Sequence, residues 1–162
     1  MKVIIHDLGS RYAGPIEAKC DRSIDADGKY APCQGCFGCW TKHPAECFMK
    51  DALRQVCRII GQADELVIVT KNLYGGYSAD IKNVLDRSIG TSTPFSTYRG
   101  HQMHHTLRYG KHGLWKVIVY GGITEAEKAT FRCMAERNAI NDGFERSEVC
   151  FIGDLAELEG LL

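Results

Sequence analysis

The sequence predicts a doubly wound α/β fold, in which a parallel sheet carries helices on both faces, as one domain over residues 1–162. Short apolar runs rich in β-branched residues recur along the chain, as expected for buried strands. Amphipathic helical patterns separate these runs, and this alternation is typical of βαβ units. With 162 residues, 44% apolar and 25% charged, the chain has the size and composition of one folded domain.

Five segments are expected to be strands of one sheet. Except in Lys19–Ala26, their hydrophobicity is continuous rather than alternating, which is typical of strands covered on both faces. Five strands with intervening helices favour a three-layer sandwich with a parallel sheet in the strand order 2-1-3-4-5. The segments are Val3–Ile5, Lys19–Ala26 (the weakest), Leu66–Val69, Val117–Tyr120 and Val149–Ile152.

Three helices are expected between these strands. The first has a single apolar stripe at helical spacing over Met49–Ile60. The second is expected to begin at the N-cap Ser78 and to stop at Gly90. The third is predicted to begin at a capping box formed by Thr124 and Glu127.

Three regions depart from a regular α/β pattern. Residues His6 to Cys33 leave room for only a shortened first helix and one strand, and Asp154–Leu162 is too short for a full covering helix. Apolar sheet surface left uncovered by these gaps predicts a homo-oligomer that buries it. Thr91–Gly113 has no clean period, so we expect a long loop that is functional or packs on a partner.

Charge and hydropathy exclude several classes of function. The 20 basic and 20 acidic residues balance to a formal net charge of zero, which argues against general nucleic-acid binding. Apolar runs such as Leu66–Val69 are too short to span a membrane. The opening Met1–Asp7 does not have the pattern of a signal peptide, so a cytoplasmic protein is expected.

Glycine pairs follow two of the predicted strands at the edge where an open parallel sheet binds its ligands. Adjacent glycines let the backbone approach a planar ligand closely, and neighbouring tyrosines can stack on or flank a ring. A plain glycine-rich turn is the alternative for either pair. The candidate residues are Asn72, Leu73, Tyr74, Gly75, Gly76 and Tyr77 after one strand and Gly121 and Gly122 after the other.

Four of the eight cysteines form the most specific motif. Cys33, Cys36, Cys39 and Cys47 are spaced C-x2-C-x2-C-x7-C. Clustered thiols in a cytosolic chain are typical of metal or redox sites, and C-x2-C-x2-C resembles the compact half of ferredoxin-type ligation of a [4Fe–4S] cluster. Zinc more often uses two separated C-x2-C pairs. Metal-free thiols also remain open.

The segment Tyr74–Arg87 resembles the flavin-binding loop and helix of the NADPH-dependent FMN reductase family, which has the flavodoxin-like fold. The four cysteines resemble those of the iron–sulfur flavoproteins in that superfamily, where they ligate a [4Fe–4S] cluster beside FMN. The resemblance implies that Asn72–Tyr77 contact the isoalloxazine on one side and Gly121-Gly122 on the other. It covers Cys33 to about Gly90 well.

The first loop departs from this family. Members have a phosphate-binding loop that opens a long helix, whereas here only Leu8-Gly9-Ser10-Arg11 is similar to that loop. Ser10 is the side chain that the resemblance assigns to FMN. Because phosphate needs several amide or hydroxyl donors, the shortened element predicts weak flavin binding, binding with a neighbouring subunit, or none.

The principal hypothesis is an FMN-dependent oxidoreductase or electron-transfer flavoprotein, with the cluster on the cysteine motif. Its donor would be NAD(P)H or ferredoxin, and its acceptor a small molecule or another redox protein. The alternative is a flavodoxin-like protein without flavin, using the cysteines for zinc or thiol redox sensing. A quinone or azo-compound reductase that needs FMN alone is a third possibility.

Overall fold

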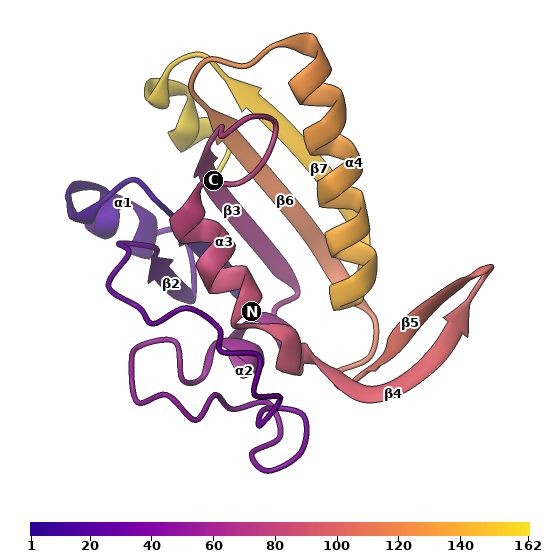
Figure 1. Ribbon diagram of the computed structural model, residues 1–162. Coiled ribbons are helices and arrows are strands. Elements are labelled where there is room, and N and C mark those ends of the chain that lie inside the picture. The colour runs from indigo at the N-terminus through magenta and orange to yellow at the C-terminus, as the bar shows by residue number, and fades with distance from the viewer.

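Five parallel strands form the central sheet of the computed structural model, which describes residues 1–162 (Figure 1). Their order is β2-β1-β3-β6-β7, and every neighbouring pair is parallel. Counting only these strands, this is the predicted order 2-1-3-4-5. Their bounds are β1 Lys2–His6, β2 Arg22–Asp25, β3 Glu65–Lys71, β6 His112–Tyr120 and β7 Phe144–Ile152.

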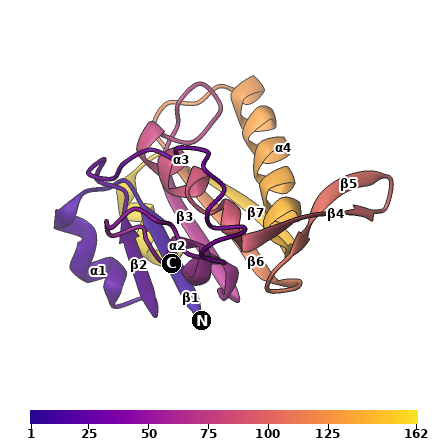
Figure 2. The same ribbon diagram turned by 60° about the horizontal axis from the view of Figure 1, so that its bottom comes forward.

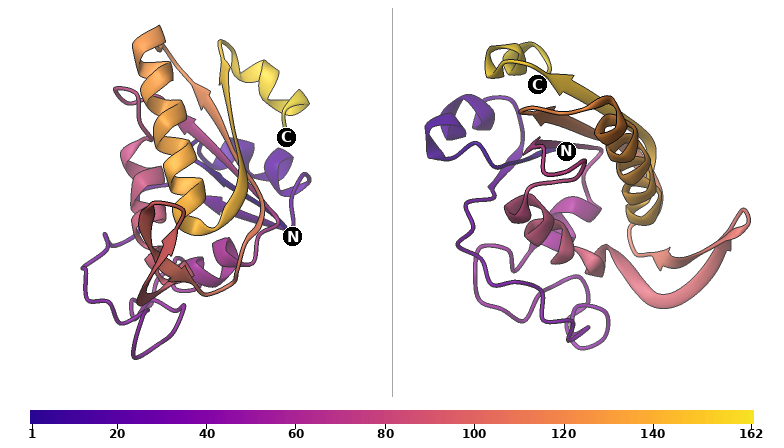
Figure 3. Two further views of the ribbon diagram at one scale, coloured as in Figure 1. Left: turned by 90° about the vertical axis from the view of Figure 1, so that its right-hand side faces the viewer. Right: turned by 45° about the horizontal axis from the view of Figure 1, so that its top comes forward.

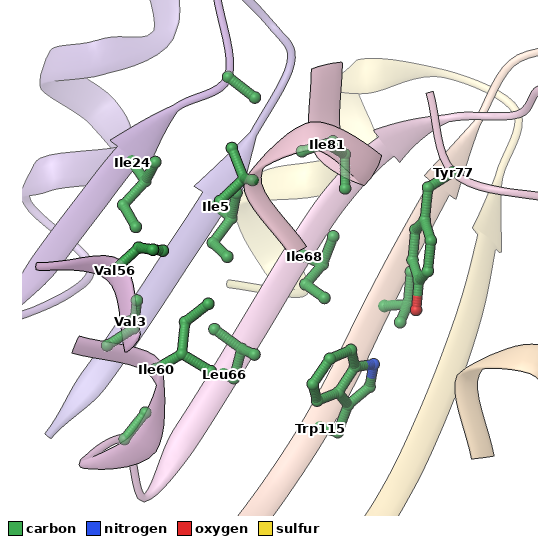
Figure 4. Close-up of a cluster of buried hydrophobic side chains, with 14 of the residues drawn as sticks. Val3, Ile5, Ile24, Val56, Ile60, Leu66, Ile68, Tyr77, Ile81 and Trp115 are labelled. Atoms are coloured by element: carbon green, nitrogen blue, oxygen red, sulfur yellow. The ribbon is translucent and has the colours of Figure 1, made fainter. Parts of the chain in front are cut away.

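The larger core lies on one face of the sheet. It contains 22 buried residues, among them Val3, Ile5, Leu66 and Ile68 from the strands (Figure 4). Three helices cover this face: α2 (Val56–Gly61), α3 (Ala79–Asp86) and α4 (Glu125–Asp142). Successive strand residues point to opposite faces, so Ile4 and Val67 belong to the other side.

That second face has a smaller core of seven buried residues. It is covered by α1 (Ala13–Glu17) and by the 3₁₀ helix η3 (Leu155–Gly160), which contribute Ile16 and Leu158. Figure 3 shows η3 and α4 on opposite sides of the sheet. The three-layer sandwich is therefore confirmed, and so are the shortened first helix and the short C-terminal cover.

The predicted helix starts are found where the sequence places them. The Ser78 hydroxyl accepts the Ile81 N–H at the start of α3 (3.4 Å). Thr124 and Glu127 form a reciprocal capping box at the start of α4. Each cap satisfies N–H groups that a first helical turn leaves without partners, which fixes where the helix begins.

The helix predicted over Met49–Ile60 is wrong in its first half, because α2 begins only at Val56. The apolar stripe is present in the sequence, but Asp51 holds the residues just before Val56 in turns. Its carboxylate accepts the Leu53 N–H (3.1 Å) and pairs with the Arg87 guanidinium. A tertiary ion pair therefore overrides local helical periodicity here.

Thr91–Gly113 is not a structureless loop. It contains two antiparallel strands, β4 (Ser92–Arg99) and β5 (Gln102–Leu107), which form a hairpin extending away from the sheet (Figures 1 and 2). Most of its side chains are exposed on both faces, so it lacks the alternation that marks a half-buried strand. Arg99 anchors the hairpin by donating to the Ile140 carbonyl of α4 (2.6 Å).

None of the helices combines the length and the apolar character that crossing a bilayer requires.

Candidate functional site

Three loops meet at the carboxyl edge of the sheet. They follow β1, β3 and β6, which are neighbours in the sheet, and they include every flavin-site residue that the sequence predicts. Asn72 ties two of them together: its side-chain amide donates to the Gly122 carbonyl (2.8 Å), and its N–H donates to the Tyr120 carbonyl (2.8 Å). The two predicted glycine pairs therefore lie in adjoining loops.

The loop after β3 folds back on itself as a tight turn. Leu73 and Gly76 exchange two backbone hydrogen bonds of 3.0 Å, and the Gly75 N–H donates to the Asn72 side chain (3.0 Å). At Gly75, an added Cβ would lie 3.3 Å from the Glu127 backbone, so glycine is needed for close packing on α4. The main role of Gly75 and Gly76 is therefore to allow this tight turn and its packing.

Tyr74 is the ring that this loop presents to solvent. Its side chain is 89% exposed, and its backbone has a positive φ of 52°, which few non-glycine residues adopt. Such conformations persist where the surroundings enforce them and are common at functional sites. Leu73 beside it is also exposed.

Tyr77 has a different position from Tyr74. Its side chain is buried, and Figure 4 shows it pointing into the core toward Trp115. Its ring packs edge to face on Phe131 with centroids 5.2 Å apart. Burial raises the pKa of the Tyr77 hydroxyl to about 12. The Tyr77 ring is therefore a core group, and only its backbone is available at the carboxyl edge.

The loop after β1 presents a row of free backbone donors. None of the N–H groups of Leu8, Gly9, Ser10 and Arg11 donates to another group of the protein. Gly9 has a φ of 79°, a left-handed conformation that favours glycine, and both Ser10 and Arg11 are exposed. Successive N–H groups of this kind form concave sites that favour anions.

The glycine pair after β6 also presents free donors. The N–H groups of Gly121, Gly122 and Ile123 have no hydrogen-bond partner in the protein, and both glycines are exposed. The first of the pair has a φ of 93°. Free amide donors therefore flank the loop of Tyr74 on either side.

Asp7 joins the ends of three strands beneath these loops. Its carboxylate accepts the Lys71 N–H (3.0 Å) and the Tyr120 hydroxyl (3.0 Å), so it links β1, β3 and β6. Burial, and secondly the Asp7 charge, raise the pKa of Tyr120. Because these donors occupy its oxygens, the Asp7 carboxylate stabilises the ends of the strands. It accepts no hydrogen bond from the N–H groups of Leu8–Arg11.

The four motif cysteines form a second candidate site. Cys33, Cys36, Cys39 and Cys47 all line one small pocket of about 20 Å³, in a segment without helices or strands. Most of its other lining is apolar, including Phe37, Phe48 and Met49. The motif therefore brings its thiols to one place, although no three His, Cys, Asp or Glu side chains in the structure are arranged to hold a metal ion.

A fifth cysteine lies directly behind this pocket. Cys57 of α2 is fully buried, and its thiol donates to the Arg87 carbonyl (3.3 Å). Hydrogen bonding with Cys57 lowers the pKa of Cys39, and the same contact together with burial raises that of Cys57. At Gly90 an added Cβ would lie 2.8 Å from the Cys57 sulfur and 3.1 Å from the Cys39 Cβ, so the backbone packs closely against both cysteines.

The two sites lie at opposite ends of α3. The loop Asn72–Tyr77 precedes this helix, whereas Arg87, which lines the cysteine pocket, follows it directly (Figure 1). Eight helical residues span about 12 Å. The cysteines are therefore separated from the carboxyl edge by the length of a packed helix.

Comparison with known proteins agrees with this geometry. The model of the NADPH-dependent FMN reductase family matches residues 19–107, more than half of the chain and including the loop after β3. The chain belongs to this family. The resemblance to the FMN reductase family found in the sequence is confirmed. No curated protein matches the sequence.

Solved structures similar to this FMN reductase family member share its flavodoxin-like fold. An FMN-dependent NADH-azoreductase from Bacillus anthracis, in complex with FMN, has 11% identity and a TM-score of 0.56 over 98% of this chain and 92% of its own. An NAD(P)H:quinone oxidoreductase from Methanothermobacter marburgensis has 14% identity and a TM-score of 0.55 over 99% and 94%. A flavodoxin, WrbA-like protein from Agrobacterium tumefaciens has 13% identity and a TM-score of 0.50 over 98% and 87%.

Some structures with this fold are longer. The chain spans 32% of a flavodiiron core from Synechocystis and 56% of a flavone reductase. At these identities, of 10% and 14%, the likeness shows the fold and no more.

The carboxyl edge of this FMN reductase family member suits FMN. The phosphate requires several donors, and the four free N–H groups of Leu8–Arg11 provide them although the helix behind them is short. A flat ring requires exposed aromatic surface and backbone donors, which Tyr74 and the Gly121–Ile123 amides provide. The donor set therefore fits the cofactor, and it includes backbone groups outside the family match.

Sequence reasoning missed the groups that act through the backbone or through burial. Of the first loop only Ser10 was assigned, whereas its neighbours offer equivalent donors. The position of Asp7 at the end of an apolar run was the available indication of its role. Nothing in the sequence placed Arg87 beside the cysteines or paired it with Asp51, which is 36 positions away along the chain.

Proposed function

We propose that this protein is an FMN-dependent oxidoreductase that takes electrons from NAD(P)H and passes them to a small-molecule acceptor. The observation that carries the proposal is the row of four unpartnered N–H groups over Leu8–Arg11 at the carboxyl edge of β1. Membership of the FMN reductase family supports the nicotinamide as donor. Ferredoxin remains an alternative donor.

Each loop would have its own part in holding the flavin. The Leu8–Arg11 amides and the Ser10 hydroxyl would bind the phosphate, and Asn72–Tyr77 would lie along one side of the ring. Gly121 and Gly122 would approach its other side. Tyr74 is exposed enough to cover the ring and limit the access of water. When bound, FMN supplies one- and two-electron transfer.

The cysteine motif is the second part of the proposal. Four thiols around one pocket are a donor set suited to a [4Fe–4S] cluster, and a cluster would let the protein couple two-electron to one-electron transfer. A zinc ion is the competing occupant. All eight cysteines are free, which is consistent with the reducing conditions of the cytoplasm, the location that we propose.

Flavin binding is tested with a glycine variant and a matched control. Gly9→Ala places a side chain on a backbone with φ of 79°, and Gly100→Ala does the same at φ of 63° in the hairpin turn; neither Cβ has an atom within 4 Å. Both variants should lose about 1 kcal/mol of stability. Only Gly9→Ala should weaken FMN binding, by about tenfold, in a fluorescence titration.

The outcome that rejects the flavin proposal is wild-type protein that shows no saturable binding of FMN. Equal FMN affinities of the wild-type protein and Gly9→Ala would remove the first loop from the site and leave the other loops to be tested.

The occupant of the cysteine pocket is tested by purification without oxygen. We expect iron and inorganic sulfide in equal amounts, with a broad absorption near 400 nm in addition to the flavin bands (about four of each per chain for a cubane cluster). Cys36→Ser should lose both elements. One zinc per chain without flavin would instead favour the alternative hypothesis of a flavin-free protein.

A further inference from the structure

Arg87 is a buried charged residue at the C-terminal end of α3. Its side chain has no exposed surface, and its guanidinium binds Asp51 through both terminal nitrogens (2.6 and 2.8 Å). One of these nitrogens also donates to the Ala31 carbonyl (2.9 Å). The ion pair with Asp51 raises the pKa of Arg87, so it is charged at every ordinary pH.

One donor of this guanidinium has no partner. Nε of Arg87 is buried and makes no hydrogen bond, although a buried donor without a partner is costly and uncommon. The geometry explains which donor remains: Asp51 and Ala31 engage the two terminal nitrogens, and Nε lies on the other edge of the guanidinium plane.

The unpartnered donor belongs to a residue of the cysteine pocket. Arg87 lines this pocket together with Cys33, Cys36, Cys39 and Cys47, and no acidic residue is part of its lining. Asp51, the partner of Arg87, retains 23% exposure and lies on the solvent side of the pair. The fold therefore brings a fixed positive charge, and a free N–H, to the place where four thiols gather.

We propose that Arg87 compensates the negative charge of a metal–thiolate centre in this pocket, with its Nε–H donating to a metal-bound cysteine sulfur. This rests on the metal centre proposed above. Four thiolates around a divalent ion or a cubane core carry a net negative charge, and burying it requires positive charge or donors nearby. Cys47 lines the pocket together with Arg87, and we assign its sulfur as the acceptor.

Arginine has properties here that lysine lacks. Its planar group can hold Asp51 with one edge and keep Nε directed elsewhere, whereas an ammonium is a single point charge. Hydrogen bonds from neighbouring groups to metal-bound ligands typically change metal affinity by about tenfold to a hundredfold. Arg87 is thus a positioning and charge-compensating residue, and the cysteines themselves are the ligands.

Cobalt binding tests the proposal without iron, flavin or turnover. Reduced protein is titrated with Co²⁺ under anaerobic conditions, and thiolate-to-cobalt charge-transfer absorption reports the bound ion. Arg87→Gln should bind Co²⁺ at least about tenfold more weakly than the wild-type protein, and Arg87→Lys should recover only part of the loss. Lys82→Gln removes one positive charge from an exposed position on the same helix and should bind as the wild type does.

A second variant separates charge from structure, including the case in which Arg87→Gln does not fold. Asp51→Asn removes the opposing charge, so the Arg87 charge acts on the pocket in full and Co²⁺ affinity should stay the same or increase. If the pair were needed only to hold the chain in shape, Asp51→Asn would weaken binding as Arg87→Gln does, and the proposal would be wrong. Folding is checked for each variant by circular dichroism.

Two other results would separately reject the role of Arg87 and the metal centre itself. A folded Arg87→Gln variant with wild-type cobalt affinity rejects the role of Arg87 and leaves the metal centre standing. Wild-type protein without any charge-transfer band rejects the cysteine metal centre, and Arg87 with it, but leaves the flavin proposal to its own titration. In the protein loaded with a cluster, Arg87→Gln should also lower the midpoint reduction potential. The variant lacks a positive charge that stabilises the reduced state, which is the more negative of the two.

Discussion

Asp142 shows how a half-buried carboxylate is tolerated near the end of a helix. It is the last residue of α4, and the Thr91 hydroxyl donates to one of its oxygens (2.8 Å). Burial raises its pKa to about 6, with the Thr91 hydrogen bond acting in the opposite direction. The carbonyl end of a helix also disfavours negative charge, so the ionised form of Asp142 destabilises the folded protein.

We therefore expect Asp142→Asn to stabilise the protein at neutral pH. The carboxyl group binds its proton more tightly in the folded state than in the unfolded state, so it lowers stability as the pH rises from about 4 to about 6. Asparagine keeps the hydrogen bond to Thr91 and does not ionise. Urea unfolding should show an advantage on the order of 1–3 kcal/mol at pH 7 that is absent near pH 4. An advantage independent of pH would contradict this assignment.

The residue scale also shows what sequence could predict about the sites. The spacing of the four cysteines is a local property of the chain, and all four line one pocket, but their role as metal ligands stays a prediction. Tyr74 and Tyr77 are equivalent in sequence, yet one is exposed and the other is buried against Phe131. That difference depends on where α4 packs, which no local pattern specifies.

At the scale of elements, the stability of α4 depends strongly on the residues that cap its two ends. Of its 18 residues only Phe131, Ala135 and Ala139 are buried, so packing stabilises a narrow stripe of the helix. Its start is fixed by the capping box of Thr124, and its end by Gly143 at a φ of 87°. The capping box is readable in sequence, which is why the start of this helix was predicted correctly.

Thr124→Ala should cost about 1 kcal/mol of folding stability, because it removes the hydroxyl that accepts the Glu127 N–H. Thr130→Ala is the matched control: this hydroxyl lies on the exposed middle of α4 and only donates to the Ala126 carbonyl (3.1 Å). The control should be neutral or slightly stabilising, since such back-bonding does not support a helix. Equal losses in chemical unfolding would show that the cap contributes nothing specific.

Other elements could not be predicted because their determinants are distant in the chain. The helix expected over Met49–Ile60 is shortened by the pairing of Asp51 with Arg87, 36 residues away. The β4–β5 hairpin has polar residues on both faces, so neither alternation nor a buried run marks its strands. The inner strands β1, β3 and β6 were recognisable because burial on both faces makes their central residues continuously apolar.

At the scale of the whole molecule, the two faces of the sheet are covered unequally. One core has 22 buried residues beneath three α-helices, and the other has seven beneath α1 and η3. Between α1 and η3 lies a groove of about 410 Å³ with a mostly apolar lining: Tyr12, Pro15, Ile16, Leu155, Leu158 and Leu162 are among its residues. We propose that a second copy of the chain covers this groove.

A charge at the rim of the groove should separate the copies. Ala156 is exposed and lines the groove, so Ala156→Glu introduces a carboxylate that association would have to bury, without changing either core. Sedimentation velocity should give a multiple of the 18.1 kDa chain mass for the wild type and the single-chain mass for the variant. Ala129→Glu, at an exposed position on α4 across the sheet, should assemble as the wild type does. A wild type that stays monomeric at high concentration, or an Ala156→Glu variant that assembles normally, would show that this groove is not where copies meet.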